Sequence, residues 1–282
     1  MKNLIDLHIH TQASDGTDSI RELLTKIKQQ GIRVFSVTDH DTVDGAREMA
    51  AQVDLSEIFI SGVEFSCKTP LAKCHILGYG IDCDNDELQT ALQEGERLRR
   101  KNLEVRLAFL KREWGIAFPQ EAVDRLYAMK SVGKPHIARE MLKLGWGRDI
   151  DDAIQNYMNG CKVQNDRIDA EMAIHAIQAA GGIAVWAHPL GGEGSRHLSA
   201  EEFEKRLEVL RGEGIQGLEC FYSRYSGEEA AYLRSRAESL GMPVSGGSDY
   251  HGENKTISLG ELGTDGREIR REQITILSEL GI

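Results

Sequence analysis

The sequence predicts an α/β protein, a (β/α) barrel with an inserted helical domain. Segments with the alternating pattern of strands are interleaved with segments of helical periodicity, and seven strand candidates can be counted along the chain. Strands that alternate with helices are typical of sheets whose helices cover the outside. A chain of 282 residues is also long enough to bury the core of one large barrel.

The first strand candidate, residues 4–10, shows the alternation clearly. Asp6, His8 and His10 point to one side of an extended chain, whereas Leu7 and Ile9 point to the other. A polar face of this kind costs stability unless a partner satisfies it, and a metal ion would do so. A His-x-His pair taken alone is more often two ordinary core or surface histidines, so the rest of the chain has to decide.

The next elements begin and end at recognisable signals. Ser19 and Glu22 form a capping box that starts a helix, whose apolar stripe ends near Gly31. Ser199 and Glu202 form a second capping box and start another helix. Two further helices are expected over residues 170–180 and 228–240, and the other six strand candidates cover residues 33–38, 58–63, 74–77, 183–187, 215–221 and 243–245.

One segment interrupts the alternation. Between about residues 92 and 160 the pattern is helical without a credible strand, and it opens on a charged run, residues 94–101, typical of a solvated helix face. We interpret this segment as a helical insertion that caps one end of the barrel over the substrate. The predicted domains are therefore the first part of the barrel (1–91), the insertion (92–165) and the second part of the barrel (166–282).

Polar residues able to bind metals stand at or just beyond most strand ends. They are His8, His10, Asp15, His40, Glu64, His188, Asp249 and His251, whereas His75 stands at the start of a strand. The C-terminal strand ends form the active-site face of (β/α) barrels, so these side chains are expected at one rim. Imidazoles and carboxylates without thiolates favour Mn²⁺, Fe²⁺ or Zn²⁺. So many ligands exceed the needs of one ion, which predicts two or three.

Charge and composition exclude several classes of partner. The formal net charge of −11 and the pI near 5.4 argue against binding to duplex nucleic acid. No apolar run approaches a membrane span, and the N-terminus lacks the pattern of a signal segment, so we expect a soluble cytoplasmic protein. Five cysteines without a Cys-x-x-Cys pair suit reduced thiols. The oligomeric state is left open.

Five short motifs are spread over nearly the whole chain. They are residues 6–10 (Asp-Leu-His-Ile-His), 38–41 (Thr-Asp-His-Asp), 62–64 (Gly-Val-Glu), 187–189 (Ala-His-Pro) and 247–251 (Gly-Ser-Asp-Tyr-His). Together they resemble the motifs of the PHP (polymerase and histidinol phosphatase) family. Residues 133–139 (Gly-Lys-Pro-His-Ile-Ala-Arg) resemble a segment of the PHP subgroup that acts on nucleoside 3',5'-bisphosphates and short RNA 5' ends. That subgroup usually has arginine where this chain has Lys134.

The resemblance implies a distorted, TIM-like (β/α)₇ barrel and a centre of two or three metal ions. The ligand sets that it implies are His8, His10, Glu64 and Asp249 for a first ion, Glu64, His75 and His188 for a second, and Asp15, His40 and His251 for a third. Mn²⁺ is the expected metal, with Fe²⁺ or Zn²⁺ as alternatives. The residues expected to take part in catalysis are Asp15, His40, Glu64 and His251.

The insertion offers cationic groups to a phosphate. His136 and Arg139 are three residues apart and so lie on one helix face, and Lys134 stands at the helix start, where free N–H groups also favour anions. From the spacing alone, a capped surface helix with ordinary charges fits equally well. The resemblance favours substrate binding by all three.

Three residues outside the insertion are harder to place. Arg224 follows a strand, which is a plausible rim position for a phosphate contact. Ser248 stands beside Asp249, where its hydroxyl could bind a phosphate oxygen or the ligand shell. Glu219 lies in the middle of a strand and fits a salt-bridged barrel residue as well as a functional one.

The predicted function is a phosphoric ester hydrolase in which a metal-bridged hydroxide attacks phosphorus in line. The expected substrate is a small phosphorylated nucleotide, first the 3'-phosphate of nucleoside 3',5'-bisphosphates, then short RNA 5' ends. The chain has no Gly-x-Ser-x-Gly elbow or Cys-His signature of a side-chain nucleophile. The alternatives are hydrolysis of a ribose cyclic phosphate, a non-catalytic metal-binding module, and amidohydrolase chemistry on C–N bonds.

Overall fold

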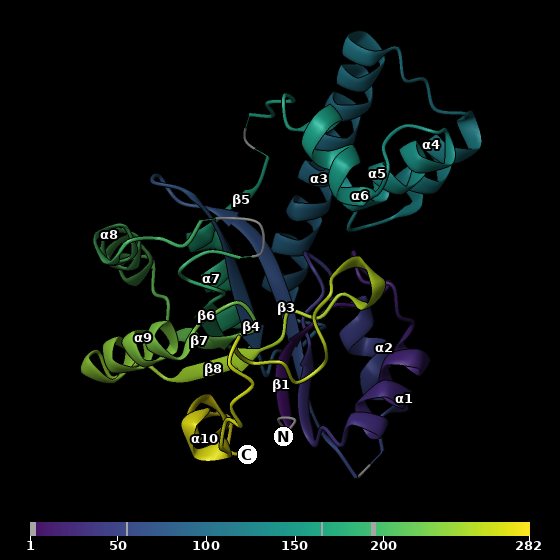
Figure 1. Cartoon of the computed structure of the whole chain (residues 1–282). Helices are drawn as coiled ribbons and strands as arrows, with labels where there is room; N and C mark the ends of the chain where they lie inside the picture. Colours follow the sequence, from purple (N-terminus) through teal and green to yellow (C-terminus); the bar gives the residue numbers. More distant parts are fainter. Residues whose placement is uncertain (1–3, 55, 165, 193–195) are drawn as a thin grey trace.

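The computed structural model of the chain describes residues 4–54, 56–164, 166–192 and 196–282, in which one sheet curls into a barrel surrounded by helices (Figure 1). The strands are β1 (Ile5–Ile9), β2 (Val34–Val37), β3 (Ile58–Lys68), β4 (Lys73–Tyr79), β5 (Ile168–Asp169), β6 (Ile183–Trp186), β7 (Gly217–Tyr222) and β8 (Val244–Gly247). Seven of them follow the order β1-β2-β3-β4-β6-β7-β8, and β5 pairs with β3 beside this path. The predicted α/β barrel is confirmed.

The two ends of the chain meet where the barrel closes. The N–H of His10 donates to the Tyr250 carbonyl at 2.9 Å, and the N–H of Asp249 donates to the His8 carbonyl at 2.8 Å. Gly247 of β8 lies so close to β1 that a Cβ there would collide with the backbone and Cβ of His8. Glycine permits this close approach, which brings residues near 8 and near 250 into one site.

The barrel is distorted because β4 runs against its neighbours. β3 and β4 form an antiparallel hairpin, and β4 pairs antiparallel with β6 as well. The other neighbours on the path pair in parallel. The first residues of β4 therefore lie at the same rim as the last residues of the parallel strands. This direction explains why His75, at the start of its strand, joins residues that stand at strand ends.

Helices cover the outside of the barrel. They are α1 (Ile20–Gln30), α2 (Asp44–Gln52), α7 (Ala170–Ala179), α8 (Ala200–Gly212), α9 (Gly227–Ser239) and α10 (Ile276–Glu279), with short 3-10 turns η2 (Gly252–Asn254) and η3 (Arg271–Gln273). The predicted capping boxes at Ser19 and Ser199 are both present. No helix in the described part of the chain combines the length and the apolar character needed to cross a membrane.

The insertion leaves the barrel on α3 (Asp86–Trp114), a helix of 29 residues (Figure 1). Leu88, Leu92 and Leu98 pack into the main core, whereas Leu103 and Leu110 belong to a separate apolar cluster. The other elements of this cluster are α4 (Gln120–Ala128), α5 (Lys134–Lys143), α6 (Ile150–Ala153) and η1 (Ile154–Met158), a π-helical turn. One continuous helix thus contributes side chains to two hydrophobic cores. The domain boundaries predicted near residues 92 and 165 stay predictions.

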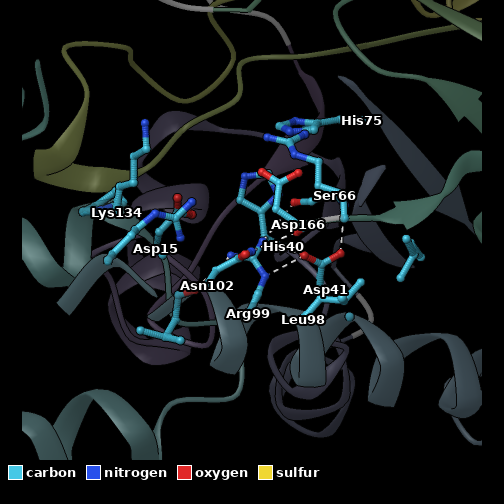
Figure 2. A pocket seen from close by; sticks show the side chains of 17 residues that line it. Asp15, His40, Asp41, Ser66, His75, Leu98, Arg99, Asn102, Lys134 and Asp166 are labelled. Atoms are coloured by element: carbon cyan, nitrogen blue, oxygen red, sulfur yellow. Dashed lines mark hydrogen bonds and ion pairs between the residues drawn. The ribbon is translucent and has the colours of Figure 1, made fainter. Parts of the chain in front are cut away.

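Arg99 fixes α3 to the rim of the barrel. Its guanidinium donates to the Asp41 carboxylate at 2.6 Å, to the Ser66 hydroxyl at 2.9 Å and to the Val132 carbonyl at 3.2 Å (Figure 2). Asp41 also accepts from the Ser66 N–H at 2.8 Å. Both charged side chains are largely buried, and breaking such a pair leaves an uncompensated charge. The insertion therefore has a fixed anchor beside the rim.

Three elements differ from the sequence-based expectations. The sequence places the end of the third strand at residue 63, but β3 continues to Lys68 because its hairpin with β4 prolongs it, so Glu64 lies inside the strand. Helix α2 has no side-chain cap, so the sequence contains no capping pattern that marks where this helix begins. Strand β5 has only two residues, too few for a period to be recognised.

Candidate metal centre

Nine side chains with nitrogen or oxygen ligand atoms converge at one rim of the barrel. They come from strands β1, β3 and β4 and from the segments that follow β1, β2, β6 and β8. In chain order they are His8, His10, Asp15, His40, Glu64, His75, His188, Asp249 and His251. The structure thus brings together all the residues predicted as metal ligands, although their role as ligands stays a prediction.

Glu64 lies in the middle of this group, and only 1% of its side chain is exposed. The ring nitrogens near its two carboxylate oxygens are Nδ1 of His40 (3.0 Å), Nε2 of His10 (3.2 Å) and Nε2 of His8 (3.3 Å) around Oε2, and Nδ1 of His75 (3.0 Å) and Nε2 of His188 (3.2 Å) around Oε1. One carboxylate therefore contacts imidazoles from four strands or strand ends, as a bridging ligand would.

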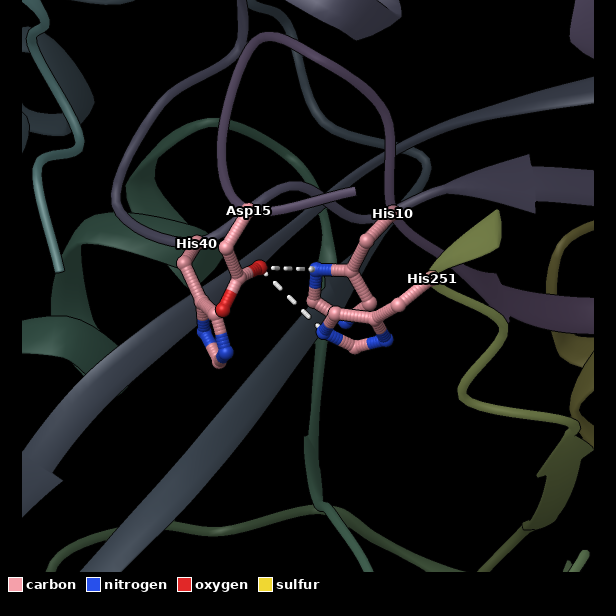
Figure 3. Close-up of side chains that lie close together, drawn as sticks. All are labelled: His10, Asp15, His40 and His251. Atoms are coloured by element: carbon pink, nitrogen blue, oxygen red, sulfur yellow. Dashed lines mark ion pairs between the residues drawn. The ribbon is translucent and has the colours of Figure 1, made fainter. Parts of the chain in front are cut away.

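Two further carboxylates complete the centre. Asp15 Oδ1 lies 3.2 Å from His251 Nε2 and 3.8 Å from His10 Nδ1 (Figure 3). Asp249 Oδ1 lies 3.3 Å from His10 Nε2 and 3.6 Å from His8 Nε2. His10 therefore faces one carboxylate through each of its ring nitrogens, and it stands between the two halves of the site.

The converging atoms lack ordinary partners. Those that are buried without any hydrogen-bond partner are His8 Nε2, His10 Nε2, Asp15 Oδ1, His40 Nδ1 and Glu64 Oε2. They approach one another closely but without hydrogen-bond geometry. Buried polar atoms are normally paired, so five neighbouring exceptions indicate a ligand that all of them share. Their nitrogen and carboxylate chemistry fits divalent metal ions.

Three overlapping groups of ligand atoms lie within 4.8 Å of one another. They are His10, Asp15, His40 and His251; His8, His10 and Asp249; and His40, Glu64 and His75. This grouping fits two or three ions, but it shares His10 and His40 differently from the sets that the resemblance implies. His188 stands outside the three groups and reaches the centre through Glu64.

Three rim residues have a backbone conformation that residues other than glycine rarely adopt. Asp41, His188 and Asp249 have φ angles of 52°, 29° and 59°, and they are the non-glycine residues with positive φ in the described chain. Such strain costs roughly 1–3 kcal/mol and collects at functional sites, where surrounding contacts hold it. Here the His188 N–H donates to Glu219 at 2.6 Å, and the Asp249 N–H donates to the His8 carbonyl.

Glu219 of β7 is a functional candidate that the sequence left undecided. It is fully buried; its Oε1 lies 2.9 Å from His8 Nδ1, and its Oε2 accepts the His188 N–H. A carboxylate behind Nδ1 fixes the imidazole so that Nε2 faces the shared centre, as in many metal sites. Because 211 residues separate Glu219 from His8, no local pattern could have revealed the contact.

Another buried carboxylate, Asp39, holds the loop that carries Asp15. It accepts from the Thr11 N–H and the Thr11 hydroxyl, both at 2.7 Å, and from the Ser14 hydroxyl at 2.5 Å. Asp39 is thus saturated by the loop and does not point into the centre.

Charges in the metal-free centre are unevenly distributed. Burial raises the pKa of Glu64, but His40 and His75 outweigh it and hold that pKa well below its usual range. Burial lowers the pKa of His10, yet the close carboxylates of Asp249 and Glu64 outweigh it and raise that pKa to about 9. At His75 burial prevails, and the pKa falls to about 4. His10 therefore carries a proton at neutral pH when no metal is bound.

We expect the affinity for Mn²⁺ to rise between about pH 6 and pH 9, because a metal must displace that proton from His10. The raised pKa stabilises the metal-free fold below the unfolded value of about 6.5, and this contribution is lost as the pH rises through about 9. Competition with a chromophoric chelator across this range measures the affinity. Calorimetry in two buffers measures the protons released. An affinity independent of pH would contradict the assignment.

The predicted substrate contacts Lys134, Arg139 and Arg224 have different surroundings. Lys134 lines a cavity together with Asp15 and His40. Arg139 lies one turn further along α5, and its Nη2 is buried without a hydrogen-bond partner. Arg224 follows β7 and is half-buried. Lys134 and Arg139 thus offer cationic groups beside the rim.

The polar groups of His136 and Ser248 are engaged elsewhere. His136 Nδ1 accepts from the Gly133 N–H at 2.9 Å, and its Nε2 donates to the Ser14 carbonyl at 2.8 Å. The N–H and the hydroxyl of Ser248 both donate to Asp6, at 2.9 and 2.6 Å. These hydrogen bonds hold the site's loops in place, and the expected contact of the two residues with phosphate stays a prediction.

Two cavities open beside the centre. The smaller, about 250 Å³, lies between the rim and the insertion and is lined by His40, His75, Arg99 and Lys134 among others (Figure 2). The larger, about 900 Å³, also includes His188, Asp249 and His251 and is bordered by Ile150 and Ile154 of the insertion. A ligand at the metal centre can therefore extend in two directions.

Comparison with known proteins agrees with this geometry. The PHP domain family matches residues 6–145. A 5'-3' exoribonuclease of Haemophilus influenzae is 30% identical over 93% of this chain and 94% of its own length. A 3',5'-nucleoside bisphosphate phosphatase of Chromobacterium violaceum is 29% identical over 88% of this chain and 87% of its own length. A phosphoribosyl 1,2-cyclic phosphate 1,2-diphosphodiesterase of Eggerthella lenta is 26% identical over 88% of this chain and 94% of its own length.

A solved structure from Chromobacterium violaceum, described as an amidohydrolase with bound sulfate and no metal, superimposes with a TM-score of 0.83. It is 26% identical, and the match covers 98% of this chain and 95% of that one. The three relatives are named for hydrolysis of phosphoric esters, which confirms the predicted class of enzyme. The match to the family and the 30% identical relative that spans nearly the whole chain lead to one conclusion: this chain belongs to the PHP domain family.

Proposed function

We propose that this protein is a metal-dependent phosphoesterase that removes the 3'-phosphate of nucleoside 3',5'-bisphosphates and also acts at the 5' ends of short RNAs. The observation that carries the proposal is the group of five buried, unpartnered nitrogen and oxygen atoms beside a cavity lined by cations. Divalent ions and phosphate oxygens are the partners that these two features need. The names of two relatives support this choice of substrate.

The chain's own part is to hold ligand atoms in fixed positions. When bound, divalent ions supply an activated water and neutralise charge on the phosphoryl oxygens. β1 presents His8, the residue that follows it is His10, and β3 presents Glu64, all three buried. The closing contact between β1 and the segment after β8 fixes Asp249 against them. Rigid supports of this kind keep the reacting groups aligned without reorganisation during the reaction.

Asp15, His40, Glu64 and His251 remain our proposed catalytic residues. Asp15 and His40 border both cavities, and His251 borders the larger one. Burial lowers the pKa of His40 and of His251, so neutral imidazoles face the centre. The leaving hydroxyl would receive its proton from a histidine of this rim or from water.

Lys134 and Arg139 of α5 are our proposed contacts for the charged phosphoryl oxygens. Burial lowers the pKa of both side chains, which shows that each cation loses hydration that an anion would replace. Lysine supplies a point charge, whereas the arginine usual at position 134 in the subgroup supplies a planar fork. We therefore expect Lys134 to attract the phosphate by its charge and Arg139 to fix the orientation of the phosphate by hydrogen bonds.

Hydrolysis of a ribose cyclic phosphate is a second candidate, favoured by the relative from Eggerthella lenta, which aligns with 88% of this chain. A non-catalytic module is disfavoured because all nine expected ligand residues are present and converge at one rim. Substrate profiling separates the two hydrolytic candidates.

The test measures phosphate release by the Mn²⁺-loaded protein from adenosine 3',5'-bisphosphate, AMP, histidinol phosphate, a ribose cyclic phosphate and a 5'-phosphorylated short RNA. We expect release to be concentrated on the bisphosphate and to fall about 10³-fold or more after chelation or in Asp249→Asn, because several kcal/mol of charge stabilisation are lost. Asp265→Asn, near the surface and outside the centre, is the matched control.

The outcomes discriminate between the candidates. Release only from the cyclic phosphate would move the assignment to a cyclic phosphodiesterase. If the metal-loaded protein releases phosphate from none of these compounds, the proposed substrate class is wrong. Equal activity of Asp249→Asn and the parent chain would show that the proposed metal centre takes no part in the hydrolysis.

A further inference from the structure

A lysine on the segment after β8 touches one of the carboxylates of the metal centre. Lys255 Nζ lies 2.6 Å from Oδ2 of Asp249, and 20% of the lysine side chain is exposed. The hydroxyl of Tyr222, at the end of β7, donates to the same oxygen at 3.0 Å. The other oxygen, Oδ1, lies 3.3–3.6 Å from ring nitrogens of His8, His10 and His251. The two oxygens of Asp249 thus have different partners, ring nitrogens on one side and two donors on the other.

Contacts with the loop after β1 hold Lys255 in this place. The Thr17 N–H donates to the His251 carbonyl at 3.2 Å, and the Glu253 N–H donates to the Thr17 hydroxyl at 2.9 Å. Gly252 has a φ of 66°, and a Cβ there would collide with the same hydroxyl. The turn η2 therefore packs closely against the loop after β1, and it fixes the backbone from which the lysine side chain starts.

Lys255 approaches the centre from a different side than the cations of the insertion. It borders the larger cavity, whereas Lys134 borders the smaller one. Both cavities reach the metal centre, because Asp15, His40 and His75 line each of them. A phosphoryl group at the centre would therefore have a lysine on two sides, one from the insertion and one from the barrel.

The positive charge of Lys255 opposes the binding of metal. An ammonium beside Asp249 attracts the carboxylate and repels a divalent ion bound to that carboxylate. A neutral donor is enough to orient a metal-binding carboxylate, and Tyr222 supplies one at the same oxygen. The charge is therefore explained by an anion that joins the metal at the centre. Phosphoryl oxygens are anions of this kind, and lysines stabilise them in phosphoryl transfer.

We propose that Lys255 is a catalytic residue whose ammonium, held beside the centre by Asp249, binds an oxygen of the phosphoryl group under attack. This inference rests on the proposed function, which places that group at the metal centre. The ammonium stabilises the negative charge on the phosphoryl oxygens in the transition state. Tyr222 is a positioning residue, because its neutral hydroxyl holds Oδ2 of Asp249 away from the ring nitrogens.

The first arm of the test measures metal affinity, which needs no turnover. Lys255→Met removes the charge and keeps most of the length of the side chain. In competition with a chromophoric chelator it should bind Mn²⁺ about 5-fold or more tightly than the parent chain, because a like charge is removed. Tyr222→Phe removes a neutral hydrogen bond from the same oxygen, and its Mn²⁺ affinity should fall because Asp249 is less well oriented.

The second arm measures the binding of inorganic phosphate to the Mn²⁺-saturated protein by calorimetry. Lys255→Met should weaken this binding by about 10- to 100-fold, the worth of a charged hydrogen bond, and should lower kcat/KM by at least as much. Lys255→Arg keeps the charge and should recover most of both. The matched control is Lys205→Met, whose exposed ammonium pairs with Glu201 on α8. It should change neither quantity.

The two arms separate this inference from the proposed function. If the parent chain hydrolyses none of the compounds, but Lys255→Met binds Mn²⁺ more tightly and phosphate more weakly, the phosphate contact stands and the proposed function fails. If Lys255→Met binds Mn²⁺ more weakly and phosphate as the parent chain does, Lys255 only supports Asp249 and the inference is overturned. Parental kcat/KM in the Mn²⁺-saturated variant also overturns it. If the methionine variant does not fold, Lys255→Gln has the same expected results.

Discussion

Replacing Glu64 by glutamine should abolish turnover and release metal from the protein. The two oxygens of this one side chain lie 3.0–3.3 Å from ring nitrogens of five histidines, so it is the shared point of the whole centre. The amide keeps the size but loses the charge, and it replaces one carboxylate oxygen with an NH2 group that has no lone pair to offer a metal ion. Several kcal/mol of lost stabilisation correspond to a fall of about 10³- to 10⁵-fold in kcat/KM.

Metal analysis and phosphate release, made on the same preparation, check this expectation. Glu64→Gln should bind fewer Mn²⁺ ions per chain and should lose the rise in melting temperature that the metal gives the parent chain, because a ligand of the folded state stabilises it in proportion to its affinity. Glu268→Gln, an exposed position, is the control for the chemical change alone. A Glu64→Gln variant with a full metal complement and near-parental rate would show that Glu64 is not a bridging ligand.

The position of His75 shows what a sequence pattern can and cannot establish. Period-two alternation predicted that His8 of β1 and His10, directly after β1, face the same side, because the face of a side chain depends only on its own extended segment. Strand direction depends on pairing with neighbours, and the reversal of β4 follows from its hairpin with β3. His75 was therefore assigned as a ligand through the resemblance to the family, and the reason for its position became visible only in three dimensions.

His136 and Ser248 illustrate the opposite case. Each stands close in sequence to residues of the site, and this proximity suggested contact with substrate. In the structure, hydrogen bonds join them to Ser14, 122 residues away, and to Asp6, 242 residues away, while their contact with substrate stays a prediction. A side chain with few donors can be committed to one distant partner, and nothing local in the sequence reports that choice.

Glu219 is the second position where a single change should have a large effect. Its carboxylate accepts from two groups at once, through Oε1 from His8 Nδ1 and through Oε2 from the His188 N–H. Glutamine offers one oxygen, so either the His8 ring or the strained backbone of His188 loses its acceptor. Residues that orient a metal-binding histidine typically affect affinity by about 10- to 100-fold, which is the loss of Mn²⁺ affinity expected for Glu219→Gln at pH 8.

The pH dependence distinguishes this positioning role from a packing defect. Burial lowers the pKa of His8, but Glu219, Glu64 and Asp249 outweigh it and raise that pKa well above its usual value. Removing the charge of Glu219 should lower the pKa of His8. At low pH, a smaller fraction of His8 then carries a proton that the metal has to displace. The affinity deficit of Glu219→Gln should therefore be largest at pH 8 and shrink toward pH 6. A deficit that is constant across this range, accompanied by a lower melting temperature, would instead mark Glu219 as a packing residue whose loss merely loosens β7.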